Sequence, residues 1–183
     1  MKQTSKPPIR DLIERIARIN AAEEWGDNLN PTQRAALSYL VRANRFSRAP
    51  SQVADFMATT RGTVTQTLKA LARKGLIEEV RSETDKRWIS YSVTRPGVEI
   101  LDRRNVIDDT VEHMEPKTRA ALGDGLKALV RGALAARNRR PFGVCETCRY
   151  HKRKTNGGYC QLLNEHLAAS EVRQICHEHQ EAA

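Results

Sequence analysis

The residues best suited to chemistry in this 183-residue chain are four cysteines, and all of them lie after residue 144. Cys145 and Cys148 are separated by two residues, and Cys160 and Cys176 follow. Four thiolates form the complete ligand set of a structural zinc ion or of an iron–sulfur cluster. The pattern therefore predicts one metal centre held by all four cysteines.

Zinc is the preferred metal, and an iron–sulfur cluster is the alternative. Zinc accepts imidazole as readily as thiolate, and the same segment contains His151, His166, His177 and His179. Each histidine taken singly is expected at the surface rather than among the ligands. The cluster is favoured because only one Cys-x2-Cys pair is present, with Cys160 and Cys176 on segments that look helical. A metal-free thiol switch is the third interpretation.

The segment around these cysteines needs a cross-link, because residues 141–160 contain few large apolar side chains. Fixing one backbone residue costs roughly 1–2 kcal/mol, and a bound metal would supply the missing free energy of folding. We expect the segment to be disordered without its metal. The centre is then either a structural support or a sensor that changes the affinity of the protein for its partner.

Composition points to the kind of partner. Lysine and arginine total 31 against 22 aspartates and glutamates, which gives a net charge of +9. Such an excess favours a polyanionic partner, most often nucleic acid. No apolar run approaches transmembrane length, so no membrane partner is expected. The first residues lack the apolar stretch of a signal peptide, which predicts a cytoplasmic protein with reduced thiols.

Three helices are predicted before residue 60. The second begins after Asn30, a good N-cap, with Pro31 at its first position. A short third helix begins at Pro50, although Ala49 before it is a poor cap. The first carries an apolar stripe that needs a partner, formed by Ile9, Leu12, Ile13, Ile16 and Ile19.

The fourth helix is the most informative. It is expected to begin after Thr60, which can cap it, and to end before Gly75, which suits a left-handed conformation. Its inner face is formed by Val64, Leu68 and Leu71. The outer face is small, polar and cationic without any acidic residue, and contains Gly62, Thr65, Gln66, Lys69 and Arg73. A solvated helix usually carries both signs of charge, so this asymmetry favours contact with DNA.

After this helix the spacing of apolar residues changes from a helical period to that of a strand. Alternation of apolar and polar residues predicts a β-hairpin over residues 77–93, with Asp85, Lys86 and Arg87 at its tip. Two long helices are expected next, over residues 94–114 and 117–137, separated by Pro116. Residues 137–143 are interpreted as a linker into the cysteine segment.

Two stretches, TTRGTVTQTLKALARKGLI at 59–77 and DKRWISYSVTRPG at 85–97, together resemble the MarR family of bacterial transcriptional regulators. The resemblance covers about residues 9–138. It implies a mainly α fold with a small β-hairpin wing, in which a winged helix-turn-helix is flanked by dimerisation helices. The implied segments are a dimerisation helix in 1–29, the DNA-binding domain in 30–95 and further dimerisation helices in 96–138. The cysteine-rich tail, 139–183, lies outside the family pattern.

In that family the helix beginning after Thr60 is the recognition helix, and the wing carries an Asp-x-Arg motif. The resemblance implies a homodimer that binds double-stranded DNA, more often as a repressor, and reads a palindrome. A small-molecule effector is a further candidate partner that the sequence does not identify. The residues expected at DNA are Thr60, Arg61, Gly62, Thr63, Thr65, Gln66, Lys69, Arg73, Asp85, Lys86 and Arg87.

These residues are expected to play different parts. Gln66 and Lys69 can reach base edges in the major groove. Thr63 and Thr65 are expected at phosphates. Arg61, nearer the packed side, is expected to contact the DNA backbone at most. The resemblance assigns Arg87 to the minor groove or backbone, while Asp85 holds an arginine in place.

The sequence leaves two other functional classes as alternatives. A metal-dependent enzyme acting on nucleic acid would need three protein ligands, an open coordination position and a general base. Four cysteines would close such a site, so no enzymatic activity is expected. The other alternative is an adaptor that binds protein through its winged helix.

Overall fold

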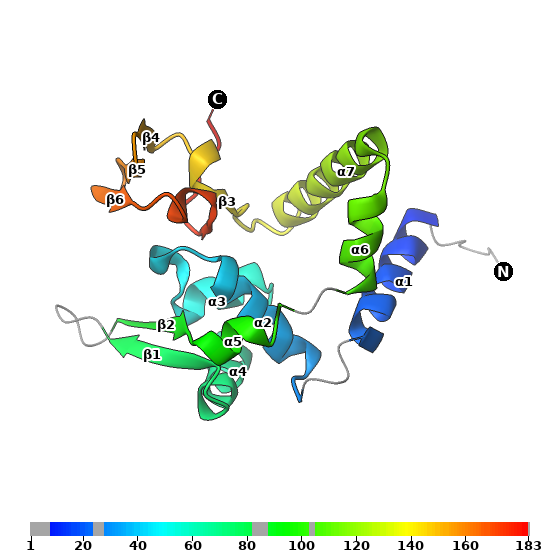
Figure 1. The fold of residues 1–183 in the computed structure, drawn as a ribbon, viewed down its shortest axis with the longest axis horizontal. Coiled ribbons are helices and arrows are strands. Elements are labelled where there is room, and N and C mark those ends of the chain that lie inside the picture. Colours follow the sequence, from blue (N-terminus) through cyan, green and yellow to red (C-terminus); the bar gives the residue numbers. More distant parts are fainter. Residues whose placement is uncertain (1–7, 24–27, 82–87, 103–104, 183) are drawn as a thin grey trace.

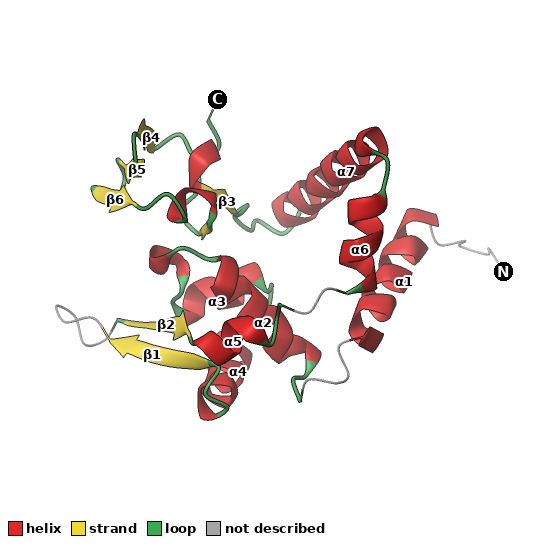
Figure 2. Cartoon of the chain, viewed as in Figure 1, coloured by secondary structure: helices red, strands yellow, loops and turns green. Residues whose placement is uncertain are grey.

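The computed structural model describes residues 8–23, 28–81, 88–102 and 105–182. A winged helix forms the lower part of the view in Figures 1 and 2, with a group of helices to its right and a β-rich module above α3. The central part comprises α2 (Pro31–Arg42), η2 (Arg45–Ser47), α3 (Pro50–Phe56), α4 (Arg61–Arg73), β1 (Ile77–Arg81), β2 (Ile89–Val93) and α5 (Arg95–Glu99).

The hydrophobic core lies where α2, α3 and α4 pack together beneath the hairpin. The inner face predicted for α4 is confirmed, because Val64, Leu68 and Leu71 are fully buried. The core is completed by Leu37, Tyr39 and Leu40 from α2, Val53 from α3, and Ile77 and Tyr91 from the strands.

The predicted helix ends are also confirmed. The Asn30 side chain accepts a hydrogen bond from the Gln33 N–H at 2.8 Å, and Pro31 opens α2. The Thr60 hydroxyl accepts one from the Thr63 N–H at 3.2 Å, and Gly75 has a φ of 69° after α4. These caps fix both ends of α4, and with them the direction of its outer face.

The wing is an antiparallel pair in which Ile77 lies opposite Val93 and Arg81 opposite Ile89. Its strands lead into α5 through Thr94, whose hydroxyl accepts from the Gly97 N–H at 3.2 Å. At Gly97 a Cβ atom would lie 2.1 Å from the carbonyl oxygen of Leu76. The close approach of α5 to the start of β1 therefore requires glycine at position 97.

The prediction of one helix over residues 94–114 is wrong, because α5 ends at Glu99 and a separate helix, α6 (Val106–His113), follows. Helical spacing of apolar residues does not show where a helix breaks. Asn105 caps the new helix by accepting from the Asp108 N–H at 3.0 Å. The next helix, α7 (Pro116–Ala135), begins at the predicted proline, with the Glu115 carboxylate as its cap.

Helix α1 (Pro8–Glu23) contacts α6, where the Asn105 amide donates to the Asn20 side chain at 2.9 Å. Neither α6 nor α7 contains a buried residue. The apolar stripe of α1 is exposed as well. Across the described ranges, no helix combines the length and the hydropathy needed to cross a membrane.

The β-rich module, residues 143–182, is called the cysteine module below. It contains β3 (Gly143–Val144), η3 (Cys145–Thr147), β4 (His151–Lys154), β5 (Gly157–Cys160), β6 (Glu165–Leu167), η4 (Glu171–Arg173) and β7 (Ile175–Cys176). The strands form a three-stranded sheet in the order β4-β5-β6 and a β3-β7 pair.

Helical segments around Cys160 and Cys176 were expected, and this expectation is wrong, because both cysteines lie in strands. For Cys160, the glycine that opens β5 explains why a strand forms instead of a helix. Gly157 has a φ of 126°, and a Cβ atom there would lie 2.2 Å from the Leu167 carbonyl oxygen, so glycine lets β5 pair closely with β6.

Candidate nucleic-acid interface and cysteine cluster

The outer face of α4 is open to solvent, as the sequence predicts. We call Arg61, Gly62, Thr63, Gln66, Lys69 and Arg73 the reading face; all six are exposed, whereas Thr65 is half-buried. Arg61 lies on the exposed side, contrary to its expected position, because it begins the helix ahead of the first buried residue, Val64. The face carries three cations and no acidic side chain.

The threonines of α4 are already engaged in local bonds. The hydroxyls of Thr60 and Thr63 lie 2.9 Å apart. The Thr65 hydroxyl donates to the carbonyl oxygen of Arg61 at 2.8 Å. A phosphate oxygen can only accept, so Thr65 would have to give up this bond to reach one. The expected wing residues Asp85, Lys86 and Arg87 lie outside the described residues.

The cysteine cluster brings together all four thiols, which the sequence places up to 31 residues apart as Cys145 and Cys176. All four are free and line one cavity of about 10 Å³, together with His151. Cys145 and Cys176 are buried. Cys145 and Cys148 lie in a tight turn, in which the Cys148 N–H donates to the Cys145 carbonyl oxygen at 3.0 Å.

Hydrogen bonds hold these thiols in their present positions. A hydrogen bond between the two buried thiols lowers the pKa of Cys176 and raises that of Cys145. The amide of Asn44 and the hydroxyl of Ser47 further favour the Cys176 thiolate. The Cys148 sulfur accepts from the Gln180 N–H at 3.5 Å.

The thiols share a cavity but are not drawn together as a ligand set: among the described residues, no three Cys, His, Asp or Glu side chains converge as metal ligands do. One atom beside the cavity is nevertheless unsatisfied. The Nε2 atom of His151 is buried and has no hydrogen-bond partner within the described chain. Of the four histidines expected at the surface, His166 is exposed, whereas His151, His177 and His179 are partly buried.

The cysteine module is docked on the helix-turn-helix, a contact that the sequence does not reveal. We call residues 43–48, between α2 and α3, the docking turn. Asn44, only 1% exposed, donates from its amide to the Cys145 sulfur at 3.3 Å. Its backbone N–H donates to the Ile175 carbonyl oxygen at 2.9 Å, beside a bridge between Ala43 and Ile175.

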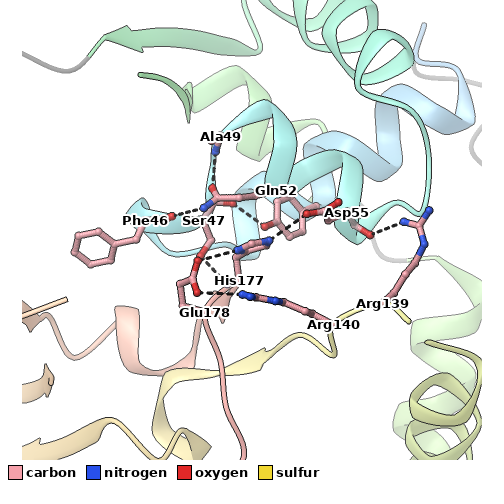
Figure 3. Close-up of polar contacts among 10 residues, drawn as sticks. Phe46, Ser47, Ala49, Gln52, Asp55, Arg139, Arg140, His177 and Glu178 are labelled. Carbon is pink, nitrogen blue, oxygen red and sulfur yellow. Dashed lines mark hydrogen bonds and ion pairs between the residues drawn. The ribbon is translucent and has the colours of Figure 1, made fainter. Parts of the chain in front are cut away.

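A second group of contacts reaches α3 (Figure 3). The His177 N–H donates to the Ser47 hydroxyl at 2.9 Å, and the His177 ring lies 3.2 Å from the Asp55 carboxylate. Phe142 packs edge-on against Phe56, with ring centroids 5.1 Å apart. The segment 137–143, interpreted from the sequence as a linker, is thus part of the docked interface.

Comparison with known proteins agrees with this geometry. Residues 27–87 match the model of the MarR family. A search of the curated proteins found no match. Among solved structures, Streptococcus pneumoniae FabT in complex with DNA matches with a TM-score of 0.57 and 26% identity, covering 70% of this chain and 94% of FabT.

Two further structures show the same fold at lower identity. The Staphylococcus aureus MepR–DNA complex has a TM-score of 0.55 and 18% identity, covering 68% of this chain and 94% of MepR. A MarR protein from Peptoclostridium difficile has a TM-score of 0.58 and 14% identity, covering 73% of this chain and 92% of its own. The cysteine module lies outside the residues that the family model matches. In its winged helix-turn-helix, residues 27–87, the chain is therefore similar to the MarR family of transcription regulators in both sequence and fold.

Proposed function

We propose that this MarR-family transcription regulator binds double-stranded DNA as a homodimer, with the reading face of α4 in the major groove. The observation that carries the proposal is the reading face itself, which is exposed, cationic and free of acidic residues. Such a face suits a polyanion, and a helix presented in this way fits the groove of B-form DNA. FabT and MepR, which share the fold, were solved as DNA complexes.

Exposed apolar stripes support the homodimer. On α1, Ile9, Leu12 and Ile16 are between 49% and 66% exposed. On α7, Leu122, Leu126 and Leu129 are between 42% and 46% exposed. Contiguous apolar surface of this kind usually marks an interface. Pairing two copies would cover both helices and present two reading faces to a palindromic site.

Repression is the proposed direction of regulation. A dimer seated on a palindrome near a promoter occupies DNA that the transcription machinery needs. The regulated genes are to be found by the same selection that tests DNA binding.

The test begins with selection of bound sites from a random pool of DNA duplexes. With the selected duplex, Gln66→Ala and Lys69→Ala should each weaken binding and relax base preference, at about 1–3 kcal/mol per lost base contact. Arg87→Ala should weaken binding to all sequences and flatten its salt dependence. The matched control is Lys127→Ala, which removes an exposed lysine of α7 that pairs with Asp124.

Binding to the selected duplex that is unchanged in Gln66→Ala, Lys69→Ala and Arg87→Ala would contradict the assignment of the reading face. Selection of no duplex, together with capture of a protein through the winged helix, would support the adaptor instead.

A further inference from the structure

The cysteine module has a core made largely of its own thiols. The buried residues of its cluster are Cys145, Leu167 and Cys176, with Phe46 of the docking turn packed against them. Its strands are two to four residues long. So small an apolar core cannot offset the ordering of about forty residues, and modules of this size usually depend on a metal or on disulfides. All four cysteines are free thiols.

The shared cavity has the size of one ion. Its volume of about 10 Å³ is near the minimum that holds a single water molecule. A four-iron cluster contains eight iron and sulfide atoms and would have to force the module open. The tight turn at Cys145 and Cys148, followed by the β4-β5 hairpin that ends at Cys160, keeps three thiols at the same cavity.

We propose that the four cysteines bind one zinc ion and that this ion raises the affinity for DNA by fixing the docking turn of the helix-turn-helix. The effect on DNA rests on the proposed function. Binding requires the sulfurs to close onto the cavity and to give up their present hydrogen bonds, because zinc binds thiolates rather than thiols. His151 lines the same cavity, and its unsatisfied Nε2 atom is available to hydrogen-bond a thiolate ligand.

Asn44 joins the thiols to the docking turn. Its amide donates to the Cys145 sulfur, while its side-chain oxygen accepts from the Phe46 N–H at 3.1 Å and so shapes η2. Groups that hydrogen-bond a metal ligand orient it and tune the affinity for the metal. Movement of the Cys145 sulfur is therefore transmitted directly to this turn.

The docking turn in turn holds two parts of the DNA-binding unit. The Ser47 carbonyl oxygen accepts a hydrogen bond from the Tyr39 hydroxyl at 2.6 Å. The Ser47 hydroxyl accepts one from the N–H of His177, the residue after Cys176. The Arg48 carbonyl oxygen accepts from the Tyr91 N–H in the wing at 3.2 Å. A bound ion would order this turn and with it α2 and the wing, so less conformational entropy is lost when DNA binds.

The experiment uses the full chain purified under reducing, anaerobic conditions. Elemental analysis should give one zinc per chain, and cobalt substitution should give the visible spectrum of tetrahedral thiolate coordination. Removing zinc with a chelator should speed amide hydrogen exchange in residues 43–56. It should also weaken binding to the selected duplex about 10-fold or more, within the usual range of such couplings.

Asn44→Ala combined with Ser47→Ala tests the connection, because it keeps all four thiols and removes the side-chain bonds of the docking turn to the Cys145 sulfur and to the His177 N–H. This variant should still bind one zinc, but removing the ion should change DNA affinity less than about 2-fold. The matched control is Arg173→Ala, which removes an exposed side chain of the module and should leave the 10-fold effect intact. Cys145→Ser should lower the zinc content and abolish the response to the chelator.

Each part of the inference has its own contrary result. A chain that neither contains nor takes up zinc, or that contains iron and sulfide, would overturn the zinc site. Bound zinc whose removal leaves exchange in residues 43–56 unchanged would overturn the connection. If zinc controls exchange there but no duplex is selected, the proposed DNA-binding function fails while the zinc site and its connection to the turn stand.

Discussion

Gly97→Ala should destabilise the joint between the wing and α5 far more than a glycine-to-alanine change usually does. The new Cβ atom would lie 2.1 Å from the Leu76 carbonyl oxygen and 2.8 Å from the Val93 Cγ1 atom. Carbon and oxygen normally approach to about 3.3 Å, so the backbones must part by roughly 1 Å. The same carbonyl accepts from the Thr94 N–H at 3.1 Å, and Leu76 belongs to the core.

Overpacking usually costs about 1–3 kcal/mol, and a clash between backbone atoms lies at or above the upper end. For a chain of this length, a loss of about 3 kcal/mol lowers the melting temperature by roughly 6–12 °C. Thermal unfolding followed by circular dichroism measures this shift.

The control is Gly132→Ala, in the last turn of α7, where a Cβ atom meets nothing within 4 Å. Alanine is the better helix former by up to about 1 kcal/mol, so this change should raise the melting temperature slightly. A Gly97→Ala protein that melts within about 2 °C of the unchanged chain would refute the close packing of α5 against β1.

Three further changes test other parts of the molecule. Phe142→Ala should cost roughly 2–3 kcal/mol, less than the 3–5 kcal/mol of a fully buried phenylalanine, and should speed proteolysis between α7 and the cysteine module; resistance equal to that of the unchanged chain would argue against docking. Leu126→Glu should yield a monomer in light scattering at micromolar concentration, whereas Lys127→Ala should remain a dimer; a dimer in both would exclude this face of α7. Gly62→Ala should change the free energy of unfolding by no more than about 1 kcal/mol, because a Cβ atom there would meet only the Thr60 hydroxyl within 4 Å, at 3.9 Å. The same change should weaken binding to the selected duplex if DNA approaches the start of α4 closely. Undiminished affinity would show that DNA does not approach there.

The sequence determined those features that depend on residues close together in the chain. The caps at Asn30 and Thr60, the left-handed Gly75 and the alternating strands of the wing each follow from local backbone preferences. The buried and exposed faces of α4 follow from the helical period alone. These local patterns, which require no tertiary contact, are enough to indicate the MarR family and the reading face.

Tertiary structure decided the rest, because contacts between distant residues depend on shape and total burial, which periodicity does not encode. Apolar spacing could not place the break between α5 and α6, since both helices share one pattern. The strands at Cys160 and Cys176 form only by pairing with β4, β6 and β3. Asn44 meets Cys145 across 101 residues. Nothing near Asn44 in the sequence marks that contact, because it exists only where the cysteine module docks on the turn before α3.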